Sequence, residues 1–190
     1  SLAHTGTGQA SAPTSGRVSY FYGVHGASMA IDTACSSALV ALIQAVQTMQ
    51  PTQTSVCGGV NALVGTSVTR SFFSAGMLSK DARCFTFDER ANGYVRAEGC
   101  AMFILKEGID DESAGGLTIV GYDVNQDGAT NGLTAPNGPS QERLIRKALT
   151  VAGMKTQDMQ LIEAHGTGTS LGDPIEVLAL HNTYGSGRRG

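Results

Sequence analysis

The stretch from Ser37 to Met49 constrains the fold most, because it predicts a helix that is apolar on almost every side. Its polar face is no wider than the Gln44 and Gln47 positions, and Pro51 follows its end. A helix that is apolar all round is a buried helix. We therefore expect this segment to lie inside the fold, as a helix that other layers cover.

A cysteine precedes this helix. Residues Ser28–Ile31 are short, apolar and preceded by Gly26, which favours a buried strand. Cys35 then lies where a strand turns into a helix, and there unpaired N–H groups and the macrodipole favour a thiolate over a thiol. The same N–H groups can hold a developing oxyanion on a thioester carbonyl. The alternative is that Cys35 is a small core residue, as most cysteines are.

The composition indicates one domain with a large buried fraction. Of the 190 residues, 41% are hydrophobic and only 15% are charged, which argues against disorder. The net charge is -3 and no run of Lys and Arg is longer than two residues, so the chain lacks the basic footprint of a nucleic-acid-binding protein. The apolar runs are far shorter than the ~20 residues of a membrane span.

The four cysteines, Cys35, Cys57, Cys84 and Cys100, are widely and unevenly spaced. No Cys-x-x-Cys pair can start a metal site, and we expect none. Reduced thiols favour a reducing compartment, so we expect a cytoplasmic protein, or a plastid one whose targeting segment lies outside this sequence. The chain begins with Ser1 rather than Met, which we interpret as an internal piece of a longer protein.

A second chemical candidate lies in the run His165-Gly166-Thr167-Gly168-Thr169, between a short predicted strand at Leu161–Ala164 and another helix. A histidine at a strand end is more often structural than catalytic. A phosphate-binding loop is excluded, because no Gly-Lys-Ser/Thr follows. We expect Asp173, Pro174 and Glu176 to form a capping box at positions N-cap, N1 and N3 of the new helix.

The rest of the chain predicts alternating elements. Ser1–Gly16 reads as a loop, and Arg17–Tyr22 as a short helix or strand. Strands are expected at Ser55–Asn61, with Cys57 in the core, at Cys100–Leu105 and at Leu117–Tyr122, and a helix at Gln141–Ala152 that Gly153 ends. The predicted strand at Leu117–Tyr122, this helix and the strand at Leu161–Ala164 favour a crossover unit of a parallel sheet. The aromatic-rich stretch from Phe72 to Asp88 either lines a pocket or packs in the core.

Read whole, four segments resemble the β-ketoacyl synthases, the condensing enzymes of polyketide and fatty-acid synthesis, and they occur in the family's order. The four segments are Asp32-Thr33-Ala34-Cys35-Ser36-Ser37-Ala38-Leu39, Phe87-Asp88 through Gly93-Tyr94-Val95-Arg96-Ala97-Glu98-Gly99, Val124-Asn125-Gln126-Asp127-Gly128, and His165 to Thr169 with Gly172-Asp173-Pro174-Ile175-Glu176. The family usually has Gly where this chain has Ala97. The resemblance covers residues 15 to 180. The motifs at Asp32–Ser37 and Val124–Gly128 are most similar to those of modular type I polyketide synthases.

The resemblance implies an α/β fold of the thiolase-like kind, layered α-β-α-β-α, with two pseudo-symmetric halves. The nucleophile half would be residues 1–107 and the start of the histidine half residues 117–190, with a boundary near Glu107–Gly116. It also implies a homodimer. Both halves would be truncated relative to a complete ketosynthase domain.

The resemblance implies an acyltransferase that forms carbon–carbon bonds by decarboxylative Claisen condensation. An acyl chain would move from acyl carrier protein to Cys35 and then react with a malonyl-type extender. His165 would donate to the thioester carbonyl of the extender, Thr167 and Thr169 would bind the pantetheine arm, and Glu176 would order the site. The domain itself would bind no cofactor, since the phosphopantetheine belongs to the carrier.

The family's conserved lysine and second histidine lie in a segment that this sequence does not contain, so we expect the chain alone to be inactive. Three alternatives stay open. The chain can belong to a fatty-acid synthase, or be a non-catalytic thiolase-like scaffold. A papain-like hydrolase fits the spacing between Cys35 and His165, within the window of about 130–150 residues, although the flanking residues do not fit.

Overall fold

The computed structural model describes residues 4–108 and 117–185, and the chain divides into two compact units. The first unit comprises Ser1–Val60 and Cys100–Asp110. The second comprises Asn61–Gly99 and Asp111–Gly190. The predicted boundary at Glu107–Gly116 falls mostly on residues outside the described ranges, so the division into residues 1–107 and 117–190 stays a prediction.

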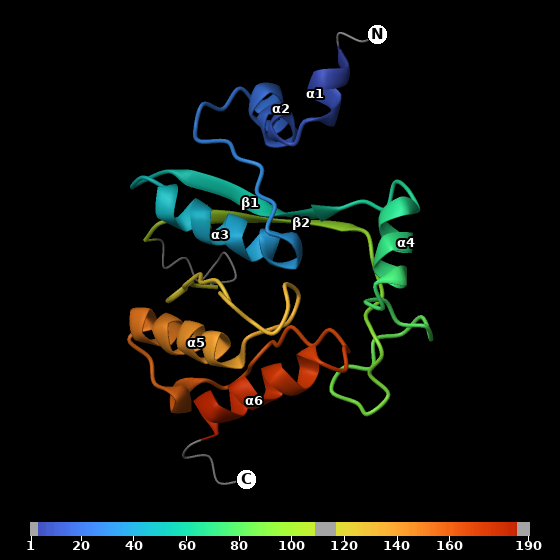
Figure 1. Cartoon of the computed structure of the whole chain (residues 1–190). Coiled ribbons are helices and arrows are strands. Elements are labelled where there is room, and N and C mark those ends of the chain that lie inside the picture. The colour runs from blue at the N-terminus through green and yellow to red at the C-terminus, as the bar shows by residue number, and fades with distance from the viewer. Residues whose placement is uncertain (1–3, 109–116, 186–190) are drawn as a thin grey trace. The chain divides into compact units, whose positions relative to one another are not determined.

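The first unit is built on two paired strands, β1 (Thr54–Asn61) and β2 (Gly99–Lys106), with helix α3 (Ser37–Thr48) beside them (Figure 1). A Cβ on Gly58 would lie only 2.0 Å from the carbonyl oxygen of Ala101, so glycine permits this close strand pairing. A Cβ on Gly59 would lie 2.8 Å from Cβ of Ala38 in α3. The two neighbouring glycines therefore let one strand approach both its partner strand and the helix.

Apolar side chains of this unit remain largely exposed. Ile43 is the buried residue of α3, whereas Leu39 is 68% exposed, and no residue of β2 is buried. Cys57 in β1 is 8% exposed, which confirms its prediction as a core residue, and burial raises the pKa of its thiol. The expectation of a fully buried α3 is wrong, because a two-stranded sheet covers only one face of a helix.

Three of the predicted strands do not form. Residues 28–31, 117–122 and 161–164 carry no strand hydrogen bonds, and the predicted crossover unit is therefore absent from the described residues. A strand exists only beside a neighbour that pairs with its N–H and C=O groups. The described residues provide these segments with no such neighbour, although their apolar composition is typical of strands.

The N-terminal stretch is helical where a loop was expected. Helix α1 spans Thr5–Gln9, and α2 spans Ala12–Tyr22, so that the predicted short element at residues 17–22 is the second half of a longer helix. Pro13 lies in the first turn of α2, where its missing N–H costs nothing. Gly23 ends this helix in the left-handed conformation, at φ 66°.

The second unit contains helices α4 (Ser67–Ser74), α5 (Gly138–Ala152) and α6 (Gly172–Tyr184), and α5 packs against α6 (Figure 1). Ala179 of α6 is 1% exposed. The predicted helix at residues 141–152 is confirmed, and it starts three residues earlier. Asn137 caps it by accepting a hydrogen bond from the Ser140 N–H at 3.2 Å, and Gly153 ends it at φ 65°.

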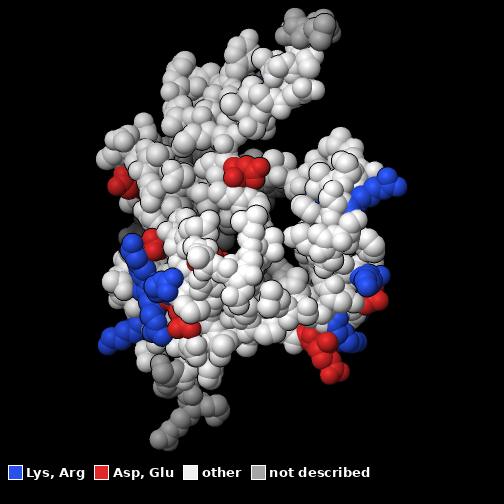
Figure 2. Space-filling model, in the orientation of Figure 1, with Lys and Arg blue, Asp and Glu red and all other residues white. Residues whose placement is uncertain are grey.

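Charged side chains are sparse on the face shown in Figure 2, which agrees with the low charged fraction of the sequence. Within the described ranges, no helix combines the length and the apolar character that a bilayer crossing requires.

Candidate active site

Cys35 lies in the 3-10 turn η2 (Ala34–Ser36), directly before α3, as its sequence position predicted. The turn is closed by side chains on both sides of the cysteine. The Ser37 hydroxyl accepts a hydrogen bond from the Thr33 N–H at 2.9 Å and donates to the Ala34 carbonyl at 2.7 Å. The thiol between these groups is exposed, so a reagent in solution can reach it.

Ala34 precedes the cysteine in a left-handed backbone conformation, with φ 57°. This conformation costs a non-glycine residue roughly 1–2 kcal/mol. Asp32 helps to hold it, because its carboxylate accepts the Ala34 N–H at 3.0 Å. This left-handed residue lies directly before Cys35, which is exposed at the start of α3.

The second candidate, the His165 loop (His165–Thr169), belongs to the second unit. Gly166 and Gly168 both adopt left-handed conformations, with φ 52° and 73°, which explains the glycines at alternating positions. His165 is exposed, and Thr167 and Thr169 are half-buried. The hydroxyls of these two threonines lie 3.1 Å apart, and that of Thr169 accepts the Gly172 N–H at 3.0 Å.

Glu176 holds the start of this loop. Its two carboxylate oxygens accept the backbone N–H groups of His165 at 2.7 Å and of Gly166 at 2.8 Å. Charge-assisted hydrogen bonds of this kind are about twice as strong as neutral ones. Glu176 of α6 therefore fixes the backbone of His165, and these bonds do not involve the imidazole.

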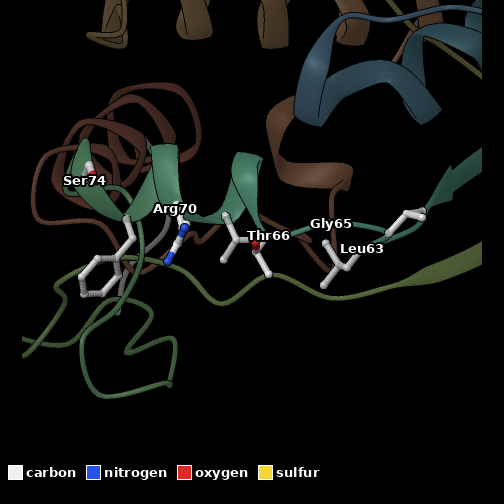
Figure 3. A pocket seen from close by; sticks show the side chains of 8 residues that line it. Leu63, Gly65, Thr66, Arg70 and Ser74 are labelled. Atoms are coloured by element: carbon white, nitrogen blue, oxygen red, sulfur yellow. The ribbon is translucent and has the colours of Figure 1, made fainter.

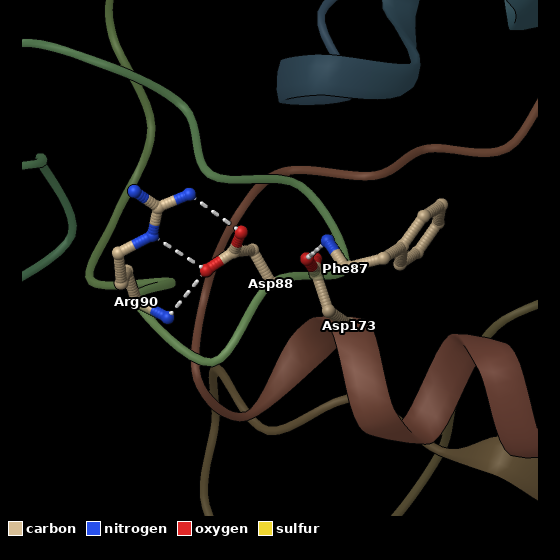
Figure 4. A network of polar contacts seen from close by, with 4 residues as sticks. All are labelled: Phe87, Asp88, Arg90 and Asp173. Carbon is tan, nitrogen blue, oxygen red and sulfur yellow. Dashed lines mark hydrogen bonds and ion pairs between the residues drawn. The ribbon is translucent and has the colours of Figure 1, made fainter.

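Asp173 holds the middle of the same loop and is 4% exposed. One oxygen accepts the Gly168 N–H at 3.0 Å. The other accepts the N–H of Phe87 at 2.8 Å, as Figure 4 shows. The predicted capping box of Asp173, Pro174 and Glu176 is wrong, because α6 begins at Gly172 with Leu171 at the N-cap. Both carboxylates point to loop amides instead of to their own helix.

A distant segment, residues 84–94, completes this network. The Thr86 hydroxyl donates to the Gly166 carbonyl at 2.6 Å, and the Gly93 N–H donates to the Gly168 carbonyl at 2.9 Å. The His165 loop is thus tied to its own helix on one side and to residues about 80 positions earlier on the other. Sequence spacing carries no signal for contacts at this separation, which is why sequence reasoning missed the roles of Asp173 and Phe87.

An ion pair stabilises the turn after Phe87. Nε and Nη2 of Arg90 each donate to the Asp88 carboxylate at 2.8 Å (Figure 4), and the backbone N–H of Arg90 adds a third bond at 2.9 Å. These bonds hold the pKa of Asp88 well below its usual range and raise that of Arg90. The guanidinium also lies 4.6 Å from the centre of the Phe85 ring.

A hollow of about 760 Å³ lies elsewhere in the second unit, between α4 and the loop before it (Figure 3). From the aromatic-rich stretch, Phe73 lines it, together with Leu63, Thr66 and Arg70. No predicted site residue is among its lining residues. Among the described residues, no three His, Cys, Asp or Glu side chains gather as metal ligands.

The structure therefore brings together four of the five predicted site residues, namely His165, Thr167, Thr169 and Glu176, in one network of the second unit. Cys35 belongs to the first unit.

Comparison with solved structures defines the class. The chain matches the ketosynthase from module 6 of the bacillaene synthase of Bacillus subtilis 168 with a TM-score of 0.86 and 36% identity, over 97% of this chain and 34% of that one. It matches an oxazolomycin ketosynthase domain of Streptomyces albus JA3453 with a TM-score of 0.83 and 38% identity, over 93% of this chain and 31% of that one. The chain thus has a thiolase-like α/β fold of the ketosynthase kind.

Sequence comparison defines the family. The model of the β-ketoacyl synthase N-terminal domain matches residues 2–110, and that of the C-terminal domain matches residues 117–190. The chain belongs to the β-ketoacyl synthase family, as its motifs predicted. Curated relatives include the pikromycin polyketide synthase component PikAII of Streptomyces venezuelae, which is 48% identical over 97% of this chain and 5% of the relative. Erythronolide synthase EryA3 of Saccharopolyspora erythraea is 45% identical over 98% of this chain and 6% of the relative. The chain spans about a twentieth of the length of these relatives.

Proposed function

We propose that this chain supplies the nucleophile and one histidine of a condensing acyltransferase in polyketide biosynthesis. The observation that carries the proposal is the exposed Cys35 in a strained turn at the start of α3, within a motif of the β-ketoacyl synthase family. The retained thiol favours condensation over simple decarboxylation. The polyketide synthases among its relatives favour polyketide over fatty-acid substrates.

The proposed reaction has two stages. The Cys35 thiolate attacks the thioester carbonyl of an acyl chain on acyl carrier protein, and the carrier's phosphopantetheine thiolate leaves and takes up a proton. In the second stage, a malonyl-type thioester loses its carboxylate as CO₂, and its electron pair forms an enolate. The enolate carbon attacks the acyl carbonyl on Cys35, the carbon–sulfur bond breaks, and the Cys35 thiolate is restored.

Each site residue has a role in this scheme. His165 donates a hydrogen bond to the extender's thioester oxygen as negative charge develops there. Thr167 and Thr169 bind the pantetheine arm of acyl carrier protein, and Glu176 fixes the histidine backbone. The domain binds no cofactor of its own, works as a homodimer in the cytoplasm, and needs the family's lysine and second histidine. The enzyme class of the complete domain is that of the β-ketoacyl-[acyl-carrier-protein] synthases. The chain alone is inactive in condensation, because it lacks this lysine and this histidine.

The test uses the complete ketosynthase domain that contains this chain. It is incubated with a short-chain acyl thioester of N-acetylcysteamine, and its mass is measured intact and after digestion. We expect one acyl group on Cys35, lost in Cys35→Ala and kept in Cys84→Ala, which removes another exposed thiol. His165→Ala should keep the acyl group but release CO₂ from malonyl-pantetheine about a hundredfold more slowly.

The absence of an acyl adduct on the wild-type domain would contradict the proposal and favour a scaffold. Cleavage of a peptide substrate, lost in Cys35→Ala, would instead favour a hydrolase.

A further inference from the structure

We infer that Phe87 is a positioning residue for His165, because it is held in a strained conformation with its ring against the neighbouring glycine of the His165 loop. The inference rests on the proposed role of His165 and adds a residue that lies 78 positions earlier in the sequence.

The backbone of Phe87 is the first observation. Its φ is 58°, in the left-handed region that bulky residues rarely adopt. In this conformation its N–H donates to Asp173 at 2.8 Å, and the same carboxylate receives the Gly168 N–H. One buried carboxylate therefore joins Phe87 to the middle of the His165 loop.

The side chain is the second observation. A Cβ built on Gly166 would lie 3.6 Å from Cζ of Phe87 and 2.6 Å from the methyl group of Thr86. The ring thus lies beside Gly166, the neighbour of His165, where it would be in contact with any side chain added there. The Thr86 hydroxyl donates to the Gly166 carbonyl at 2.6 Å. The side chains of Thr86 and Phe87 therefore both lie next to Gly166 of the His165 loop.

Burial does not explain this phenylalanine. The residue is 52% exposed, so it contributes only part of the apolar burial of a core residue. A glycine here would relieve the strain and keep the hydrogen bond to Asp173. What glycine would lose is the packing against Gly166, and this contact is the function that we assign to the ring.

The experiment compares Phe87→Gly and Phe87→Tyr with the wild-type complete ketosynthase domain. Two steps are timed separately, namely acyl transfer to Cys35 and CO₂ release from malonyl-pantetheine. We expect Phe87→Gly to acylate Cys35 within twofold of the wild-type rate and to release CO₂ about tenfold more slowly, since a misplaced group costs this much or more. Phe87→Tyr, which keeps the ring, should restore CO₂ release to within twofold.

Wild-type CO₂ release in Phe87→Gly would overturn the inference. So would a fall in the rates of both steps together with a fall in the thermal midpoint, because that pattern indicates a purely structural role.

A second measurement does not depend on activity, namely the imidazole signal of His165 in ¹⁵N-histidine NMR of the same samples. It should broaden or shift in Phe87→Gly and not in Phe87→Tyr, and an unchanged signal would also contradict the inference. If the wild type shows no acylation, the proposed function fails, while the NMR comparison still decides this inference.

Discussion

At the scale of single residues, two acidic side chains near the start of α6 bind the preceding loop rather than capping the helix. The sequence predicted that Asp173 and Glu176 are important and lie in the first turns of a helix. It did not predict their partners, since an acid in a first turn serves equally well as a cap or as an acceptor for a loop. One of those partners, Phe87, lies 86 residues away, and only the folded chain shows this.

Asp173→Asn tests this arrangement. The amide keeps the size of the carboxylate but offers one acceptor oxygen, so its NH₂ group must face one of the two N–H donors. We expect a loss of about 2 kcal/mol in the free energy of unfolding, measured by urea denaturation of the complete domain, together with slower CO₂ release.

The matched control is Asp158→Asn. Asp158 is exposed and accepts a single local hydrogen bond, from Lys155 N–H at 2.7 Å. We expect less than about 1 kcal/mol there. Equal losses of unfolding free energy in the two variants would show that the two hydrogen bonds of buried Asp173 stabilise the fold no more than the single exposed one of Asp158.

At the scale of elements, the two helices predicted around α3 and α5 form, whereas α1 and α4 were not predicted and three predicted strands are absent from the described residues. The helices around residues 37–48 and 138–152 form as expected, because a helix satisfies its backbone groups within one segment. The apolar segment at residues 117–122 has strand composition but no strand neighbour among the described residues. Gly121 instead packs on α5, where a Cβ would lie 2.6 Å from the Ala148 carbonyl oxygen.

The end of α5 gives a clean measure of backbone strain. Gly153 has φ 65°, and a Cβ added there would meet no atom within 4 Å, so Gly153→Ala strains the backbone without a clash. We expect a loss of about 1 kcal/mol in the free energy of unfolding by chemical denaturation.

Gly132→Ala is the matched control, since that position is equally open and its φ lies outside the left-handed region. It should be neutral or slightly stabilising, by less than about 1 kcal/mol. A similar loss at both positions would argue against conformational strain as the cause.

At the scale of the whole molecule, the chain exposes apolar residues that its sequence assigns to a core. The match covers 97% of this chain but 34% of the solved bacillaene ketosynthase. Leu39 on α3 and Phe103 and Ile104 on β2 are examples of large apolar side chains that are more than half exposed. The prediction of a fully buried α3 is therefore wrong for the described residues, which cover only part of this apolar surface.

This surface has a measurable consequence. We expect the 190-residue chain alone to bind the dye ANS strongly and to self-associate in sedimentation, because large apolar patches drive association. The complete ketosynthase domain should bind several times less dye per molecule. Weak dye binding and a monodisperse monomer for the chain alone would contradict this expectation.

The attachment of the histidine backbone to α6 also links the site to its surroundings. The Glu176 carboxylate accepts the N–H groups of His165 and Gly166. Any sliding or rotation of α6 against α5 would therefore shift the backbone of His165. Substitutions in the layer between α5 and α6 should therefore alter turnover without touching a substrate. Directed evolution for faster or slower condensation would find useful changes there, remote from the reacting atoms.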